Sequence, residues 1–438
     1  MIIQQIRRLA LEVPAEQPAR PRVRVPNWLL VPGLASLAVS LAFYGLYLRD
    51  HSLAGTDFRM YLGATRTFLD GDPVYRAGYT GLNLPYTYPP VTMTFLIPLT
   101  WLDENVALYV WSVAGLLAML AVVWLTTRMT GYEGVRGRLG VAAAVLAVLL
   151  WTEPLQRNFH LGQINIFVML LVVVDLALPD RSRFKGIGIG AATATKLLPG
   201  LFVVYLLLTR RIRAAVVAAG TFAGLTLLGA IIQPRNSFDY WVTGRAFDNQ
   251  PMLGGSGPRY AGNQSLQGLV ARQLDTNELN TSWWMLSVVV VAVAGLALAT
   301  ALQRNGEEAM ALVVVGCTML LISPVSWSHY WLWTAPMAVV LIDVVRRSRG
   351  VARVVAGVVA VAATLPFLLW PGTIPTGETI PRGLIWNSAH MEGRAKWLAA
   401  DSYSLTVLVL FALAALWLVH RRRAERAVTP AADVPDGG

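Results

Sequence analysis

The sequence predicts an all-α polytopic membrane protein, built as one bundle of about eleven or twelve transmembrane helices. Of the 438 residues, 55% are hydrophobic and only 14% are charged, and the mean hydropathy is +0.53. A soluble domain carries about 25% charged residues. The charges also gather in short clusters between long apolar runs, which is typical of integral membrane proteins.

Apolar segments able to cross a bilayer recur along the chain. We expect crossings at residues 28–48, 106–127, 139–151, 164–178, 187–208, 214–232, 283–302, 309–322, 330–345, 351–370 and 405–419. A crossing needs about 20 apolar residues, or fewer where a helix is broken or buried in the bundle. Residues 187–208 are expected to form two short helices broken at Pro199, and residues 91–101 to dip into the membrane and return.

Clusters of basic residues set the expected orientation, because loops rich in Lys and Arg stay cytoplasmic. The clusters are Arg20, Arg22 and Arg24; Arg136 and Arg138; Arg181, Arg183 and Lys185; Arg210, Arg211 and Arg213; Arg346, Arg347, Arg349 and Arg353; and residues 421–423. We therefore predict a plasma-membrane protein with a cytoplasmic segment at 1–26, a single transmembrane domain at 27–420 and a disordered cytoplasmic tail at 421–438. The clusters also favour anionic membrane lipids.

Four loops are then expected on the extracytoplasmic side, at about residues 49–88, 152–163, 234–282 and 371–404. Loops longer than about 12–15 residues are uncommon unless they are functional or disordered. Many tryptophans fall near this side, and both an aromatic belt and a sugar-binding surface would account for them.

Asp57 is the first acidic candidate, in the stretch DFRMYLGATRTFLDG. An aspartate here suits a helix N-cap, and Gly71 suits the helix end. The loop closes on LPYTYPP, which contains Tyr88 and turns the chain back to the membrane. A polar, aromatic loop at the bilayer surface also suits a lipid-carried substrate, so Asp57 has both a structural and a functional interpretation.

Polar residues also head or interrupt two apolar segments. Gln163 and Asn165 begin the helix of GQINIFVMLL, where interfacial polar residues are common. Lys196 lies inside an apolar region, three residues before Pro199. A lysine at membrane depth is costly and is by default a functional candidate, with phosphate as a natural partner. Snorkelling to the interface is the alternative.

The stretch GPRYAGNQSLQGLVAR is predicted on the outer side. Asn263 and Gln264 suit a hydroxyl-rich ligand and Arg259 suits phosphate, although such stretches are commonly turns. In SPVSWSHYWLW, His329 lies two residues after Trp327. It could act as an acid, as a base or as a hydrogen-bond donor to phosphate, or it could be structural.

Several function classes are excluded or unsupported. Cys317 is the single cysteine, so no intramolecular disulfide can form. No HExxH, Walker A or GxSxG motif supports a zinc protease, an NTPase or an α/β-hydrolase. The net charge of +11 is accounted for by the basic clusters, and no nucleic-acid-binding motif accompanies it, so no nucleic-acid partner is expected.

Five motifs in order carry a resemblance to a known family. They are DFRMYLGA…DGDPVY…YTYPP, GQINIFVMLLVVVDL, ATKLLPGLFVVYLLLTRR, GNQSLQGLV and SPVSWSHYW. Together they resemble glycosyltransferase family 87, whose members have a GT-C fold and use polyprenyl-phosphate sugars in envelopes of mycobacterial and corynebacterial type. The match spans roughly residues 57–333 and implies a GT-C-type bundle with extracytoplasmic loops.

The resemblance implies a polyprenyl-phosphate mannose donor and a lipid-anchored glycan acceptor at the outer membrane face. Asp57 matches the family's first-loop acid, the general base, and His329 matches the histidine of its SPxSWxH motif. Tyr330 stands where the family often has a second histidine. The candidate substrate- or phosphate-binding residues are Arg59, Lys196, Arg259, Asn263, Gln264, Tyr88, Gln163 and Trp327.

The implied reaction is an inverting α-mannosyl transfer, with α-(1→2) as the expected linkage. A β-linked donor that gives an α-linked product requires one displacement, so one carboxylate base suffices, unlike the pair of a glycosidase. No cofactor is implied beyond the lipid-phosphate donor as co-substrate. No metal is implied either, because Asp57 has no second carboxylate at a fixed spacing.

Two alternatives stay open. One is arabinofuranosyl transfer from decaprenyl-phosphate arabinose, which nothing in the sequence separates from mannosyl transfer. The other is a transporter of lipid-linked sugars without catalysis. Long asymmetric outer loops and the lack of an internal repeat argue against a transporter.

Overall fold

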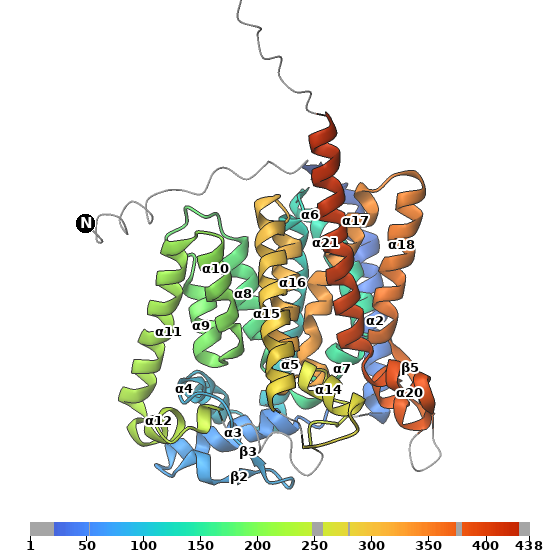
Figure 1. Cartoon of the computed structure of the whole chain (residues 1–438). Coiled ribbons are helices and arrows are strands. Elements are labelled where there is room, and N and C mark those ends of the chain that lie inside the picture. The colour runs from blue at the N-terminus through green and yellow to red at the C-terminus, as the bar shows by residue number, and fades with distance from the viewer. Residues whose placement is uncertain (1–21, 52, 248–256, 279–280, 374–378, 429–438) are drawn as a thin grey trace, which may run out of the picture.

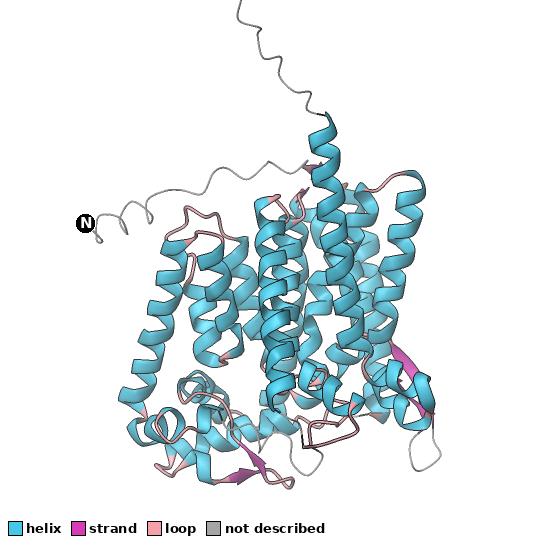
Figure 2. Ribbon diagram, in the orientation of Figure 1, coloured by secondary structure: helices cyan, strands magenta, loops and turns pink. Residues whose placement is uncertain are grey.

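Helices from all parts of the chain run side by side in one bundle in this computed structural model, and the strands are few and short (Figures 1 and 2). The structure describes residues 22–51, 53–247, 257–278, 281–373 and 379–428. The bundle helices are α2 (Leu30–Asp50), α5 (Glu104–Met129), α6 (Val135–Leu149), α8 (Asn165–Ala177), α9 (Ile187–Thr195), α10 (Leu201–Leu208), α11 (Ile212–Ile232), α15 (Thr281–Arg304), α16 (Glu308–Ile322), α17 (Thr334–Arg347), α18 (Gly350–Thr364) and α21 (Ser402–Val428). The predicted all-α polytopic fold class is confirmed.

Six of the described helices are long and apolar enough to cross a membrane alone. They are Asn27–Asp50, Glu104–Met129, Ile212–Ile232, Trp283–Arg304, Gly350–Phe367 and Ser402–Arg421. A seventh crossing is counted if α7 (Glu153–Leu161) and α8, bent by 118°, form one span. The larger number expected from the sequence includes shorter bundle helices, which neighbouring helices can cover at membrane depth.

The two ends of the bundle differ in structure. One end, here called the loop end, holds α3 (Thr56–Leu69), η2 (Val74–Arg76), β2 (Gly78–Tyr79), β3 (Leu84–Pro85), α4 (Val91–Leu96), η3 (Ile97–Trp101), α7, α12 (Pro234–Trp241), η5 (Arg245–Phe247), α14 (Leu266–Gln273), η7 (Ser328–Trp333), η8 (Leu365–Phe367), β5 (Leu369–Thr373), β6 (Thr379–Gly383), α19 (Leu384–Asn387), η9 (Ser388–His390) and α20 (Gly393–Ala400). The strands pair as β2–β3 and β5–β6, both antiparallel. The four predicted outer loops supply most of these elements, at the bottom of Figure 1.

The opposite end, here called the basic end, holds η1 (Asn27–Leu29) and the parallel pair β1 (Val23–Arg24) and β4 (Tyr132–Glu133). The described part of the chain starts here, and α21 also ends here (Figure 1). The described residues of the basic clusters lie in the turns at this end and in the adjoining ends of helices and of β1. Most of the loop-end elements and the basic clusters thus lie at opposite ends of the described bundle.

The breaks predicted in the helices are present. α9 ends at Thr195, η4 (Leu198–Gly200) contains Pro199, and α10 begins directly after it. Lys196 lies in this break. Residues 91–101 form α4 and η3 at the loop end instead of a bundle helix (Figure 1).

The C-terminal boundary differs from the prediction. α21 continues to Val428, past the predicted start of a disordered tail at 421. Ala, Arg and Glu are good helix formers, which explains the extension. Residues 429–438 of the predicted tail, and residues 1–21 of the predicted N-terminal segment, lie outside the described residues.

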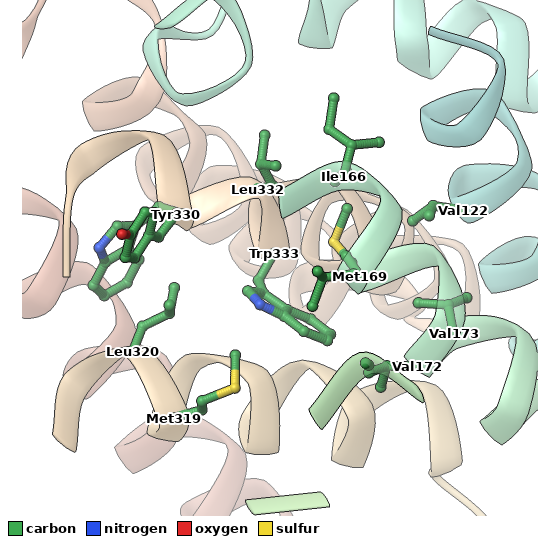
Figure 3. Packing of buried hydrophobic residues seen from close by; sticks show 14 of the residues in the cluster. Val122, Ile166, Met169, Val172, Val173, Met319, Leu320, Tyr330, Leu332 and Trp333 are labelled. Atoms are coloured by element: carbon green, nitrogen blue, oxygen red, sulfur yellow. The ribbon is translucent and has the colours of Figure 1, made fainter. Parts of the chain in front are cut away.

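The core joins helices that are distant in sequence. Figure 3 shows Met169, Val172 and Val173 of α8 packed near Val122 of α5 and close to Trp333. On α16, Gly316 makes room for the Trp333 indole, because a Cβ there would lie 2.3 Å from the ring. This packing fixes η7 and the start of α17 against the bundle.

The contact between α2 and α6 depends on glycine and gives the first prediction. A Cβ on Gly33 would lie 2.0 Å from the Gly140 carbonyl oxygen, whereas a Cβ on Gly45, on the same helix, would meet nothing within 4 Å. Gly33→Val is therefore expected to destabilise the protein by about 1–3 kcal/mol or more, because backbone must move. Thermal unfolding in detergent should show a lower Tm for Gly33→Val and little change for Gly45→Val. Equal Tm values would contradict this packing.

Candidate active site

Asp57 lies in the first turn of α3, at the loop end. The residue at the N-cap is Gly55, with a φ of 58°, and no side chain caps the helix. The Asp57 carboxylate does not serve as the cap; it accepts a hydrogen bond from Nε2 of Gln163. α3 is held by burial of Phe58 and Leu62 against α5. The N-cap interpretation of Asp57 is therefore wrong.

Gln163 lies at the sharp bend between α7 and α8, where Gly162 adopts a φ of 68°. Its Oε1 accepts hydrogen bonds from the hydroxyls of Tyr61, at 3.0 Å, and Tyr88, at 3.2 Å. The same oxygen lies 3.2 Å from the donor Nδ2 of Asn165. Three donors on one amide oxygen fix the orientation of the side chain, so that Nε2 points to Asp57.

The network continues to Lys196. Its Nζ donates to Oδ1 of Asn165 at 2.7 Å and lies 3.5 Å from the centre of the Tyr330 ring. A hydrogen-bonded chain therefore runs from the Asp57 carboxylate through Gln163 and Asn165 to Nζ of Lys196. Lys196 and Tyr330 also line a small internal space of about 30 Å³.

His329 reaches the same region from η7, which follows the end of α16. The residue is 6% exposed, and its Nε2 has no hydrogen-bond partner among the described residues. Next to it, the Ser328 hydroxyl donates at 2.8 Å to Glu153, which also accepts from Trp386 and Tyr403. The buried Glu153 carboxylate thus holds η7, α19 and α21 around α7.

These residues surround one cavity of about 270 Å³. Its lining comes from α3, β3 and the turn after it, α7 and the bend after it, the loop before α14, η7 with the residue before it, and α19. The lining residues are Asp57, Met60, Leu84, Pro85, Thr87, Tyr88, Arg157, Leu161, Gln163, Tyr260, Trp327, Ser328, His329, Tyr330 and Trp386. Asp57 and His329 thus share a cavity at the loop end although 272 positions separate them, counted as 329 minus 57.

The pKa values of both titratable candidates, Asp57 and His329, are shifted in this cavity. Burial raises the pKa of Asp57 to about 6, against the opposing effects of the Gln163 hydrogen bond and of the Lys196 and Arg157 charges. Burial, together with the same two cations, holds the pKa of His329 well below its usual range. At neutral pH the site therefore combines a mostly ionised carboxylate with a neutral imidazole.

Arg157 on α7 is the charged residue of the cavity lining that sequence reasoning missed. Its guanidinium lies 4.7 Å from the centre of the Trp386 ring. Within the described part of the chain it has no carboxylate partner. An unpaired cation beside an ionised carboxylate and a neutral imidazole suits an anionic ligand.

Comparison with known proteins identifies the family. The sequence profile described as glycosyltransferase family 87 matches residues 86–324, more than half of the chain. The chain belongs to glycosyltransferase family 87.

The family 87 chain is 32% identical over 424 residues to a polyprenol-phosphate-mannose-dependent α-(1-2)-phosphatidylinositol mannoside mannosyltransferase of Mycobacterium tuberculosis, covering 92% of this chain and 93% of the relative. A protein of the same name from Mycolicibacterium smegmatis is 30% identical, over 76% of this chain and 80% of the relative. An α-(1->3)-arabinofuranosyltransferase of Corynebacterium glutamicum is 26% identical, over 90% and 88%.

The family profile contains Tyr88, Gln163 and Lys196 but ends before His329 and starts after Asp57. The structure of this family 87 chain brings Asp57, Tyr88, Gln163, Trp327 and His329 into one cavity, with Lys196 behind Tyr330. Among the described residues, no group of three or more His, Cys, Asp or Glu side chains could hold a metal ion.

Four other candidates lie outside the cavity lining of the family 87 chain. Arg59 pairs with Glu104, and Arg259 pairs with Asp275 at the surface. Asn263 and Gln264 are fully buried and bind backbone groups. Asn263 Oδ1 accepts from the Ser326 N–H, and Gln264 Nε2 donates to Ala261 and Ala400 carbonyls. The Asn263 amide thus fastens the long loop to the segment that carries His329, and the Gln264 amide fastens it to α20.

Proposed function

We propose that this protein transfers a mannosyl residue from polyprenyl-phosphate mannose to a lipid-anchored mannoside, with inversion, using Asp57 as the general base. The single observation that carries the proposal is the shared cavity of Asp57 and His329, with Arg157 on its wall and Lys196 behind it. Membership of glycosyltransferase family 87 and the names of the mannosyltransferase relatives support the sugar and the donor.

The proposed step is a single displacement. The acceptor hydroxyl loses its proton to the Asp57 carboxylate as its oxygen attacks the anomeric carbon. The bond from that carbon to the phosphate oxygen breaks, and polyprenyl phosphate leaves with the electron pair. The products are the new glycoside, polyprenyl phosphate and protonated Asp57, which returns its proton to water. No covalent sugar–enzyme intermediate forms.

The cations have a separate role in this proposal. Arg157 lines the cavity and has no anionic partner among the described residues, so its fork of N–H groups is available to the donor phosphate. When it is protonated, Lys196 adds positive charge from behind the Tyr330 ring, in a setting with little water to screen it. A neutral His329 imidazole can accept a hydrogen bond from a sugar hydroxyl, or donate one to a sugar hydroxyl or to the phosphate.

We place the loop end on the extracytoplasmic side of the plasma membrane and both termini in the cytoplasm. The basic clusters at the opposite end support this orientation, because loops rich in arginine stay cytoplasmic. A lipid-linked donor and a lipid-anchored acceptor can both reach a cavity at the membrane surface from the same leaflet.

Arabinofuranosyl transfer is the second candidate, favoured by the similarity to an arabinofuranosyltransferase. Purified protein should be given radiolabelled polyprenyl-phosphate mannose or decaprenyl-phosphate arabinose, each with a lipid-anchored mannoside acceptor. The proposal predicts a labelled product from the mannose donor, sensitive to α-mannosidase. A labelled product from the arabinose donor alone would show that the transferred sugar is arabinose and not mannose. The absence of a covalent product with either donor would favour a transporter.

The raised pKa of Asp57 gives a pH prediction for the transfer. Because the base must be ionised, kcat/KM for the acceptor is expected to fall about tenfold for each pH unit below about 6, and to level off above it. Burial holds the pKa of His329 well below its usual range, which favours the neutral imidazole here. A pH–rate profile that stays flat between pH 5 and 7, with the protein still folded, would count against Asp57 as the base.

A further inference from the structure

A second charged pocket lies at the basic end, far from the active-site cavity. It has a volume of about 490 Å³ and is lined by Arg22, Arg128, Gly131, Tyr132, Glu133, Gly134 and Arg138. It is formed where α5 ends, where α6 begins and where β1 pairs with β4. We call this site the Arg138 pocket.

The charge of the Arg138 pocket is unbalanced. Glu133 is its one acidic lining residue, and that carboxylate lies 3.2 Å from a guanidinium nitrogen of Arg22. Arg128 and Arg138 then carry two positive charges without a carboxylate among the described residues.

Arg138 is the buried member of this pair. The residue is 6% exposed, and its guanidinium stacks 4.5 Å from the centre of the Trp124 ring. Its Nε and Nη1 atoms are buried without a hydrogen-bond partner in the described structure. Leaving buried charged donors unpaired is costly, so a bound anion would complete this site.

Other described arginines at the basic end that are buried, such as Arg211, or partly buried, such as Arg347, are paired. Arg211 lies 2.5 Å from Glu308 and 3.2 Å from Asp180, and Arg347 lies 2.8 Å from Glu307. The bundle thus supplies carboxylates to arginines that serve only to join helices. Arg138 differs from them because it faces a cavity and a second arginine.

We propose that the Arg138 pocket binds the phosphate of an anionic phospholipid from the leaflet at the basic end. Guanidinium forks match phosphate oxygens, and basic pockets between helices on the cytoplasmic side suit anionic headgroups. The pocket opens beside apolar surface, because Val135, which follows Gly134, is 65% exposed and Trp28, on the η1 segment packed against α6, is 69% exposed. Acyl chains can lie along this surface, which free phosphate would not use.

The test compares lipids on the full-length protein. Wild type in micelles containing equal amounts of phosphatidylglycerol and phosphatidylcholine with the same acyl chains should retain phosphatidylglycerol in native mass spectra. Arg138→Gln should lower that preference about fivefold, and Arg128→Gln should lower it by a similar factor. Arg136→Gln is the matched control, because Arg136 is exposed on the same helix and does not line the pocket. Sugar transfer by all three variants should match wild type, which shows that they fold.

Three outcomes would overturn the proposal. Wild type could show no preference for phosphatidylglycerol, or Arg136→Gln could lower the preference as much as Arg138→Gln and Arg128→Gln do. Millimolar inorganic phosphate could also displace the lipid completely, which would make a soluble phosphate the occupant. If Arg138→Gln fails to fold, the comparison of Arg128→Gln with Arg136→Gln still decides.

Discussion

Asp57→Asn is expected to reduce the rate of sugar transfer about 10²–10⁴-fold, the range typical of a lost general base. The amide is nearly the same size as the carboxylate and can still meet Gln163, so the cavity should keep its shape. It cannot take the proton of the acceptor hydroxyl. The measurement is kcat/KM for acceptor with saturating donor, across pH 5 to 8, and the variant should also lose the fall in rate below about pH 6.

Two controls separate an effect on catalysis from an effect on folding: the Tm of Asp57→Asn and the transfer rate of a matched variant. The folded-state pKa of Asp57 is about 6, above the ordinary value of 3.8, so folding favours its protonated form. The ionised carboxylate therefore lowers stability increasingly as the pH rises from about 4 through 6, and Asp57→Asn should have an equal or higher Tm at pH 7. Asp72→Asn, an exposed change in the same outer loop, should leave transfer unaffected. Transfer at the wild-type rate by folded Asp57→Asn would refute the assignment.

Arg157→Gln is expected to reduce kcat/KM for the polyprenyl-phosphate donor about 10²–10³-fold, as when one charge-stabilising donor is removed from an active site. The phosphate gains negative charge as its bond to the sugar breaks, so the loss should appear in kcat as well as in KM. Arg157→Lys should recover part of the rate, because the charge remains but the planar fork is lost.

The control for Arg157 is Arg394→Gln, which removes an exposed arginine of α20 at the same end of the bundle. It should transfer at the wild-type rate. If folded Arg157→Gln and Arg394→Gln were equally active, Arg157 would have no role with the phosphate, although Asp57 could still be the base. The two predictions therefore fail independently.

The motif residues illustrate what sequence could predict about the site. Asp57, Tyr88, Gln163, Trp327 and His329 were all named from short motifs, and all line the same cavity. The sequence could predict that these residues meet, because the expected sidedness of the loops places their motifs at the same end of the bundle.

Long-range contacts explain what the sequence could not provide. In the sequence, Arg157 is one of several charged residues of a short outer loop. The aromatic ring that it contacts, Trp386, belongs to the last outer loop, so the sequence does not reveal this contact. The bonds that join Asp57 to Lys196 through Gln163 and Asn165 depend on the 118° bend between α7 and α8. No local spacing encodes that bend.

Polar residues in the long loops were harder to interpret. Asn263 and Gln264 looked suited to a sugar ligand, yet their amides bind backbone carbonyls and N–H groups inside the protein. A buried amide that satisfies backbone groups and an amide that binds a sugar have the same sequence signature. Only the contacts of the fold distinguish them.

The most direct measurement of the central claim is an experimental structure of the Asp57→Asn variant with polyprenyl-phosphate mannose bound. We expect the donor phosphate to lie within hydrogen-bonding distance of Arg157, and the anomeric carbon of the sugar to lie in the cavity between position 57 and His329. A donor phosphate held elsewhere, or a sugar separated from position 57 by packed protein, would contradict it.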